Sequence, residues 1–214
     1  MGEVVSIAED GGGAARGALE RTIAAGGVAV FPADGLYGLA CDPLDAAAIE
    51  RIHEIKGRDD GKPSAVLYFS PPAMRELVEG LGPRTRAAVG RLLPGPVTLV
   101  VANPQRRYPL ACREDGEQLG VRLIGGPLAG AMCPIFQTSA NLSGEPAPAR
   151  FADVPEAIVA RVELAIDGGE LTGLPSTVVD LTDFDRGGGW TVLREGGMTN
   201  GDLAARLEAP KAGR

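Results

Sequence analysis

Apolar residues along the chain follow two different spacings, and each spacing predicts one kind of element. Ile49, Ile52 and Ile55 recur at helical spacing between Asp45, a candidate N-cap, and Gly57, which can end a helix. Similar patterns, with glycine or proline near the ends, predict the remaining helices. Together the predicted helices cover residues 17–27, 45–57, 71–81, 84–93 and 152–162.

Short runs rich in Val, Leu and Ile predict strands instead. They cover residues 28–31, 64–69, 95–102, 118–124, 164–167, 176–181 and 190–196, while 129–136 is predicted to be helical or irregular. Because strands and helices intermix without strict alternation, the expected fold class is a single α/β domain with a twisted mixed sheet, parallel and antiparallel, flanked by helices. This domain is expected over 17–200, between a leader segment, 1–16, and a C-terminal tail, 201–214.

The composition limits the classes of protein to which the chain can belong, but it does not identify the function. With 214 residues the chain can bury one sizeable core, and with 4% aromatic residues that core is expected to be mainly aliphatic. The net charge of −7, from 21 basic and 28 acidic residues, excludes a surface that binds polyanions all round. A local basic groove is still compatible with that charge.

The cysteines and the hydropathy of the chain indicate in which cellular compartment the protein is expected. One histidine and three cysteines without CxxC spacing give no zinc motif, and the cysteines are expected to be reduced. No apolar run approaches the roughly 20 residues that cross a bilayer, and the first residues lack the pattern of a signal peptide. We therefore expect a soluble, cytoplasmic protein that does not contact a membrane.

Four clusters of polar residues and glycine adjoin the predicted strands, where α/β proteins often present groups to a ligand. Taken singly, each such cluster is more often a turn, a helix cap or a solvated loop than a binding loop. The clusters are "PADGLYGL" after 28–31, "KGRDDGKPS" before 64–69, "TSANLSG" near 137 and "DGGELTGLPST" between 166 and 178.

The combination of these clusters indicates a site for a phosphorylated ligand. Lys56, Arg58 and Lys62 place three cations within seven positions of an otherwise acidic chain. Arginine offers a bidentate fork to phosphate and lysine a point charge. Ser139 and Asn141 add side-chain hydrogen-bonding groups, and the amides of their loop can approach an anion. Neither a Walker sequence nor a GxGxxG loop is present, so neither standard loop would hold a nucleotide.

In order and spacing, seven segments of the chain resemble the YrdC-like family of threonylcarbamoyl-adenylate synthases, also described as putative translation factors. The resemblance covers about residues 17 to 198. The segments are "VAVFPADGLYGLACDP", "KGRDDGKP", "LLPGPVTLVV", "GVRL", "TSANLSGEPAP", "DGGELTGLPSTVVDL" and "VLREGG".

The resemblance implies a deep cavity in which ATP, L-threonine and bicarbonate give threonylcarbamoyl-AMP and pyrophosphate. It implies Mg²⁺ but no metal-binding residues, and a partner complex that transfers the threonylcarbamoyl group to tRNA. The catalytic positions would be Arg58, Lys62 and Arg194. Beyond these three, the ATP-binding positions would include Lys56, Ser139, Ala140 and Asn141, and the amino-acid positions would be Arg122, Ser176, Thr177, Ala33, Gly35 and Leu67.

The chain departs from the family pattern on the amino-acid side. Ala33 and Gly35 stand where members carry threonines, Leu67 stands where they carry histidine, and no proline follows two residues after Arg122. Two accounts are therefore open, a synthase with a rearranged threonine pocket or a paralogue with another acceptor. Two further classes are also open: an RNA- or ribosome-binding factor without turnover, and an enzyme that handles carbamoyl-adenylate.

Overall fold

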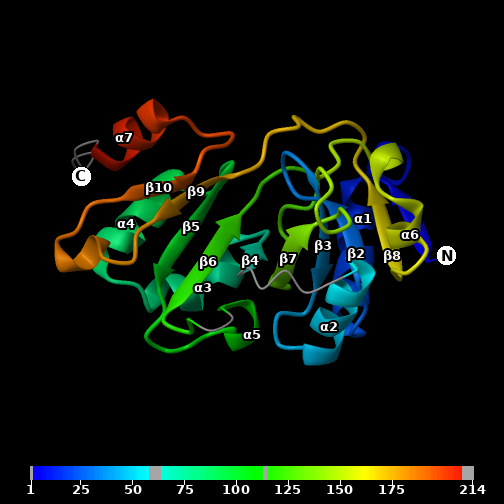
Figure 1. Cartoon of the computed structure of the whole chain (residues 1–214), viewed down its shortest axis with the longest axis horizontal. Coiled ribbons are helices and arrows are strands. Elements are labelled where there is room, and N and C mark those ends of the chain that lie inside the picture. Colours follow the sequence, from blue (N-terminus) through cyan, green and yellow to red (C-terminus); the bar gives the residue numbers. More distant parts are fainter. Residues whose placement is uncertain (1, 58–63, 113–114, 209–214) are drawn as a thin grey trace.

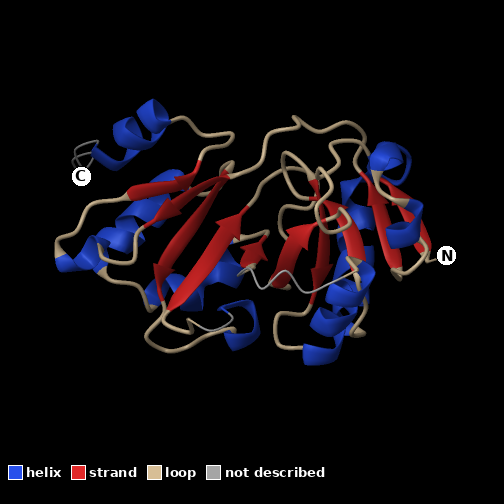
Figure 2. Cartoon of the chain, in the orientation of Figure 1, coloured by secondary structure: helices blue, strands red, loops and turns tan. Residues whose placement is uncertain are grey.

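A ten-stranded sheet runs along the longest axis of the molecule (Figures 1 and 2). The computed structural model describes residues 2–57, 64–112 and 115–208. The strands are β1 (Glu3–Ser6), β2 (Ala29–Pro32), β3 (Tyr37–Cys41), β4 (Ala65–Tyr68), β5 (Val97–Ala102), β6 (Gln118–Leu123), β7 (Ile135–Ser139), β8 (Leu164–Asp167), β9 (Thr177–Asp180) and β10 (Thr191–Arg194). The helices are α1 (Ile7–Ala24), α2 (Ala46–Ile55), α3 (Pro71–Glu79), α4 (Pro83–Leu92), α5 (Pro109–Cys112), α6 (Glu156–Val159) and α7 (Asn200–Glu208), with short 3₁₀ turns at Phe151–Asp153 and Phe184–Arg186.

The strand order is β1-β8-β2-β3-β7-β4-β6-β5-β9-β10, so many neighbours in the sheet are distant in the sequence. The pairs β1–β8, β8–β2, β4–β6 and β5–β9 are parallel. The pairs β2–β3, β3–β7, β7–β4, β6–β5 and β9–β10 are antiparallel. The predicted mixed α/β sheet flanked by helices is confirmed.

The side-chain period of two divides the sheet into two faces. On β5, Val97, Leu99 and Val101 point to one face, whereas Thr98 and Val100 point to the other. The first face carries the larger apolar core, to which α2, α3, α4, α6 and α7 contribute. The second face carries a smaller core packed against α1. Beyond the strands that α1 covers, the second face forms the wall of a cavity.

The ends of the fold differ from the predicted boundaries. The segment predicted as a leader, 1–16, contains β1 and the first part of α1, which is kinked at Gly11 with φ of 83°. The glycines of that part dilute the helical pattern, so the sequence does not reveal it. The segment predicted as a tail, 201–214, supplies most of α7, and its Leu203 and Leu207 are buried in the first core.

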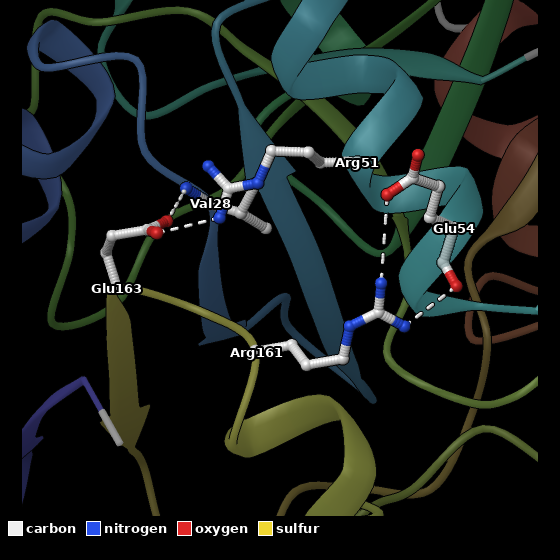
Figure 3. A network of polar contacts seen from close by, with 5 residues as sticks. All are labelled: Val28, Arg51, Glu54, Arg161 and Glu163. Atoms are coloured by element: carbon white, nitrogen blue, oxygen red, sulfur yellow. Dashed lines mark hydrogen bonds and ion pairs between the residues drawn. The ribbon is translucent and has the colours of Figure 1, made fainter.

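A polar network at the start of β8 fixes the position of α2 (Figure 3). The Glu163 carboxylate accepts a hydrogen bond from the Val28 N–H at 2.8 Å and pairs with Arg51 at 2.7 Å. Arg161 donates to the backbone carbonyl of Glu54 at 3.0 Å. Burial would raise the pKa of Glu163, but the bonds from Val28 and Arg51 outweigh it and hold the pKa below its usual value. The network therefore joins α2 to the strands β2 and β8.

We expect Glu163→Ala to lower the free energy of unfolding by about 1–3 kcal/mol, because the fully buried Val28 N–H would lose its carboxylate acceptor. Urea denaturation measures this loss. Since the pKa of Glu163 is lowered by folding, its contribution is present at neutral pH and disappears as pH falls below about 4.

Glu170→Ala is the matched control, because it breaks only the exposed Arg150–Glu170 pair. Its cost should be about 0–1 kcal/mol. Equal losses in the two variants would contradict the assigned role of Glu163.

Candidate active site

The second face of the sheet opens into a cavity of about 870 Å³, which is in the size range of small-molecule sites. Its wall comes from strands that are far apart in the sequence, including β4, β5, β6, β7 and β10. The structure brings together the following predicted site residues on this wall: Ala33, Gly35, Lys56, Arg122, Ser139, Asn141, Ser176 and Arg194.

Other predicted residues lie elsewhere. Ala140 is fully buried in the first core, and its N–H donates to the Tyr37 carbonyl at 2.9 Å. Thr177 is buried and also faces the first core. Both of its neighbours in the chain, Ser176 and Val178, line the cavity, so the alternation of the strand turns Thr177 to the opposite face. Leu67 is fully buried in the second core and does not line the cavity.

The predicted phosphate-binding residues Arg58 and Lys62 lie outside the described residues. Lys56 and Ser64, on either side of that segment, both line the cavity.

The ammonium group of Lys56 holds the loop that follows β7. It donates to the Ser139 carbonyl at 2.6 Å, to the Asn141 carbonyl at 2.9 Å and to Asn141 Oδ1 at 3.4 Å. The Lys56 carbonyl in turn accepts from the Ser143 N–H at 3.0 Å. Lys56 is only 7% exposed, so the end of α2 and this loop form one rigid wall. These contacts make Lys56 a residue that positions the loop.

Within that loop, Asn141 fixes the backbone turn. Its side-chain amide donates to the Leu142 carbonyl at 2.9 Å and the Glu145 carbonyl at 2.7 Å, and its Oδ1 accepts from the Ser139 hydroxyl. The short polar residues therefore satisfy one another and keep the loop close to the cavity. Such a loop can present a hydroxyl and backbone groups to a ligand without moving.

Arg122 places a buried positive charge on the cavity wall. It is 5% exposed, donates to Gln137 Oε1 at 3.1 Å and the Ala33 carbonyl at 3.2 Å, and its buried Nε has no hydrogen-bond partner. Burial lowers the pKa of Arg122 to about 10; Asp34 raises the pKa and Arg194 lowers it, both by smaller amounts. Within the described part of the chain, Arg122 forms no ion pair. A buried cation without a counter-ion favours an anionic ligand.

A second guanidinium stands on the same wall. Arg194 donates through Nε and Nη2 to the Ser176 carbonyl, at 3.3 Å and 2.8 Å, and through Nη2 to the Ser176 hydroxyl at 3.1 Å. Burial lowers the pKa of Arg194. Because Arg194 also depresses the pKa of Arg122, the two cations share one electrostatic environment. Together they make this end of the cavity positive.

Gly35 and the segment before β9 close one side of the cavity. The Gly173 N–H donates to the Gly35 carbonyl at 2.9 Å, and a Cβ on residue 35 would overlap the Leu174 carbonyl oxygen. The glycine that departs from the family pattern is therefore required by the close approach of Leu174. Tyr37 fixes the same region, because its hydroxyl donates to the Gly169 carbonyl and accepts from the Gly168 N–H.

The part of the chain that the structure describes contains neither a metal-binding cluster nor a helix that could span a membrane. There, no three His, Cys, Asp or Glu side chains group closely enough to hold a metal ion. Asp115 and Glu145 are the carboxylates on the described cavity wall. No helix in the described ranges has the length and apolar character needed to cross a membrane.

Sequence reasoning missed Thr98 and Gln137, which both line the cavity. Each is a polar residue in an apolar strand, within "GPVTLVVA" and "CPIFQTS". A polar residue in an apolar strand is the only signal that the sequence offers for these two residues. It is a weak signal, because threonine is common in strands. Only the pairing of the strands places these two side chains beside Ser176 and Arg122.

Comparisons with known proteins agree with this architecture. The family profile Sua5_yciO_yrdC, described as telomere recombination, matches residues 21–196. The threonylcarbamoyl-AMP synthase of Thiobacillus denitrificans is 36% identical over 183 residues, which cover 83% of this chain and 96% of that protein. The threonylcarbamoyl-AMP synthase of Pyrococcus abyssi is 32% identical over 179 residues, which cover 81% of this chain and 51% of that protein.

Two solved structures have the same fold. The P. abyssi Sua5 complexed with L-threonine has a TM-score of 0.77 and 28% identity, over 94% of this chain and 60% of that one. The E. coli YciO structure has a TM-score of 0.76 and 25% identity, over 92% of this chain and 96% of that one. The chain thus spans three fifths of the Pyrococcus structure.

The sheet, the half-covered second face and the cationic cavity define an α/β protein built to bind an anionic ligand. With the profile and the relatives above, the chain belongs to the Sua5/YciO/YrdC family, as its sequence motifs indicated.

We expect Gly35→Ala to destabilise the protein by about 1–3 kcal/mol, because the new methyl group must displace Leu174 or the loop that carries residue 35. Thermal and urea denaturation measure the change. Gly125→Ala is the control, since a Cβ there meets no atom within 4 Å. A neutral effect of Gly35→Ala would show that the two segments are not in close contact.

Proposed function

We propose that the protein is an L-threonylcarbamoyladenylate synthase, an enzyme that converts ATP, L-threonine and bicarbonate into threonylcarbamoyl-AMP and pyrophosphate. Support comes from the relatives named threonylcarbamoyl-AMP synthase, one of which the chain covers almost end to end. It also comes from the likeness to a Sua5 structure with bound L-threonine.

Arg122 is the observation that carries this proposal. Its guanidinium is nearly buried, has an unpartnered Nε and faces no carboxylate within ion-pair distance in the described ranges. The α-carboxylate of an amino acid matches this requirement, because an arginine–carboxylate contact is planar and charge-assisted. Gln137 and the Ala33 carbonyl keep the guanidinium in place for that contact.

The nucleotide occupies the remaining polar wall in this proposal. Ser139 and Asn141 would contact ATP from the loop that Lys56 holds, and Arg194 would neutralise charge on the phosphates. Arg58 and Lys62 keep the phosphate-binding roles assigned from the sequence. Ala140, Thr177 and Leu67 would support the wall from the two cores.

The chemistry proposed for this cavity needs orientation and charge neutralisation more than acid–base groups. The threonine amine and bicarbonate give a carbamate with loss of one water molecule, and a carbamate oxygen then attacks the α-phosphorus while pyrophosphate leaves. Holding the carbamate in line with the leaving group lowers the barrier through position, and the guanidinium groups compensate the growing negative charge. The absence of the single histidine, His53, from the described cavity wall is compatible with this chemistry.

The proposal includes Mg²⁺ and a later transfer to RNA. The described residues offer the carboxylates Asp115 and Glu145 at the cavity but no three-ligand cluster, which fits an ion held mainly by ATP phosphates. When bound, Mg²⁺ would supply further charge neutralisation. A downstream tRNA-modifying complex in the cytoplasm would receive the threonylcarbamoyl group.

The altered first loop fits a synthase with a rearranged threonine pocket. In place of a side chain at residue 35, the backbone carbonyl oxygen of Leu174 approaches Gly35, and both residues line the cavity. A backbone acceptor can bind a hydroxyl or ammonium group in the way a threonine side chain would. We therefore keep threonine as the amino-acid substrate.

The direct test is release of pyrophosphate from ATP and bicarbonate with each amino acid supplied in turn. We expect release with threonine and much less with other amino acids. Nucleotide binding without any amino-acid-dependent release would contradict the proposed reaction. Release with a different amino acid would retain the reaction class and replace threonine.

We expect Arg122→Met to raise the KM for threonine about 10- to 100-fold, because the carboxylate loses a charge-assisted partner. ATP affinity, measured by calorimetry without threonine, should change much less. Arg150→Met is the control, since Arg150 lies in an exposed ion pair and does not line the cavity. An unchanged KM for threonine in Arg122→Met would show that Arg122 does not bind the carboxylate of the substrate.

A further inference from the structure

Thr98 is a polar residue in the middle of the apolar strand β5. Its side chain is 8% exposed and lies on the cavity face, whereas its neighbours Val97 and Leu99 are fully buried in the first core. Val100, two residues further on, shares the cavity face and is apolar. An apolar side chain is therefore tolerated on this stretch of wall, and the hydroxyl of Thr98 is not required by burial alone.

The Thr98 hydroxyl forms the base of a chain of three side chains that ends at a cation. Thr98 Oγ1 lies 2.8 Å from Ser176 Oγ, and Ser176 Oγ accepts from Arg194 Nη2 at 3.1 Å. The Ser176 carbonyl accepts from Nε and Nη2 of the same guanidinium. Arg194 Nη1 makes no hydrogen bond in the described part of the chain, and Arg194 lines the cavity.

The donor is fixed in one hydrogen bond of this chain and open in the other. Arg194 can only donate, so it uses one lone pair of Ser176 Oγ. Between Thr98 Oγ1 and Ser176 Oγ either hydroxyl can donate, and donation from Thr98 satisfies the proton of the more deeply buried group. Ser176 Oγ then accepts twice, and its own proton is left for an acceptor in the cavity.

We propose that Thr98 is a positioning residue for a phosphate group, acting through Ser176 to aim one hydroxyl proton and one guanidinium nitrogen at the same oxyanion. The assignment deepens the proposed function, on which it rests, because the pyrophosphate released from ATP carries such oxyanions. It moves Ser176 from the amino-acid positions, where the family resemblance placed it, to the phosphate side of the cavity. Thr98, which lines the cavity, acts in this role through Ser176. It prevents the Ser176 hydroxyl from turning its proton toward the protein.

The test measures binding of inorganic pyrophosphate by calorimetry to the wild type, Thr98→Val and Thr98→Ser. Valine keeps the branched shape but cannot donate, so the Kd of pyrophosphate should rise about tenfold. Serine restores the donor, so Thr98→Ser should bind within about twofold of the wild type. A Thr98→Val protein that binds like the wild type would overturn the proposal, as would a wild type that does not bind pyrophosphate.

A double-mutant cycle separates positioning from a general packing effect. If Thr98 acts through Ser176, adding Thr98→Val to Ser176→Ala should cause no further loss of pyrophosphate affinity. A further tenfold loss in that background would overturn the proposal. Thr85→Val is the matched control, because Thr85 is a buried threonine on α4 whose backbone N–H bonds Asp185 and which does not line the cavity. Its melting temperature should fall while its pyrophosphate affinity stays unchanged.

Turnover of the same variants distinguishes this proposal from the proposed function. A wild type that releases pyrophosphate, with Thr98→Val affinity unchanged, overturns only the role of Thr98. A wild type that releases none, with Thr98→Val affinity weakened as expected and restored in Thr98→Ser, supports the role of Thr98 and overturns the reaction.

Discussion

The two-residue period of the strands imposes the constraint on which the whole structure depends. The strands that line the cavity keep mostly apolar side chains at the positions facing the first core, as Val97 and Leu99 do on β5, and the polar Thr177 of β9 is fully hydrogen-bonded there. Chemistry is therefore confined to the alternate positions, where Arg122, Ser139 and Ser176 stand. A shift of one residue in any of these strands would exchange the two sets and abolish both core and site.

The position of helix α1 determines which part of the second face is left open for a ligand-binding site. Its buried residues cover the strands near the N-terminal edge and make a second core there. Among the residues that the structure describes, no helix covers the remaining strands of that face in the same way, and their backbones and polar side chains form a cavity instead. Leu67 marks the border, since it occupies a cavity-face position but packs in the second core. One helix thus divides a single surface into a stabilising part and a binding part.

Much of the architecture could be predicted from the sequence, and each part that could not has its own physical cause. Strands β3 and β7 are interior strands that pair on both sides, so their sequences "YGLAC" and "IFQTS" lack a clear alternation. The kinked start of α1 is hidden by its glycines. The motifs located most of the cavity wall, but propensity cannot reveal that Ala140 and Thr177 face a core, because strand pairing decides their direction.

The order of strands across the cavity has a consequence for how binding arises during folding. The wall combines Ala33 from the first quarter of the chain with Arg194 from the last tenth, and β7 is inserted between β3 and β4. A fragment must span residues 33–194 to contain all the described residues of the wall. During synthesis the nascent chain can therefore complete the cavity only after Arg194 has been added and the edge strand β10 has docked.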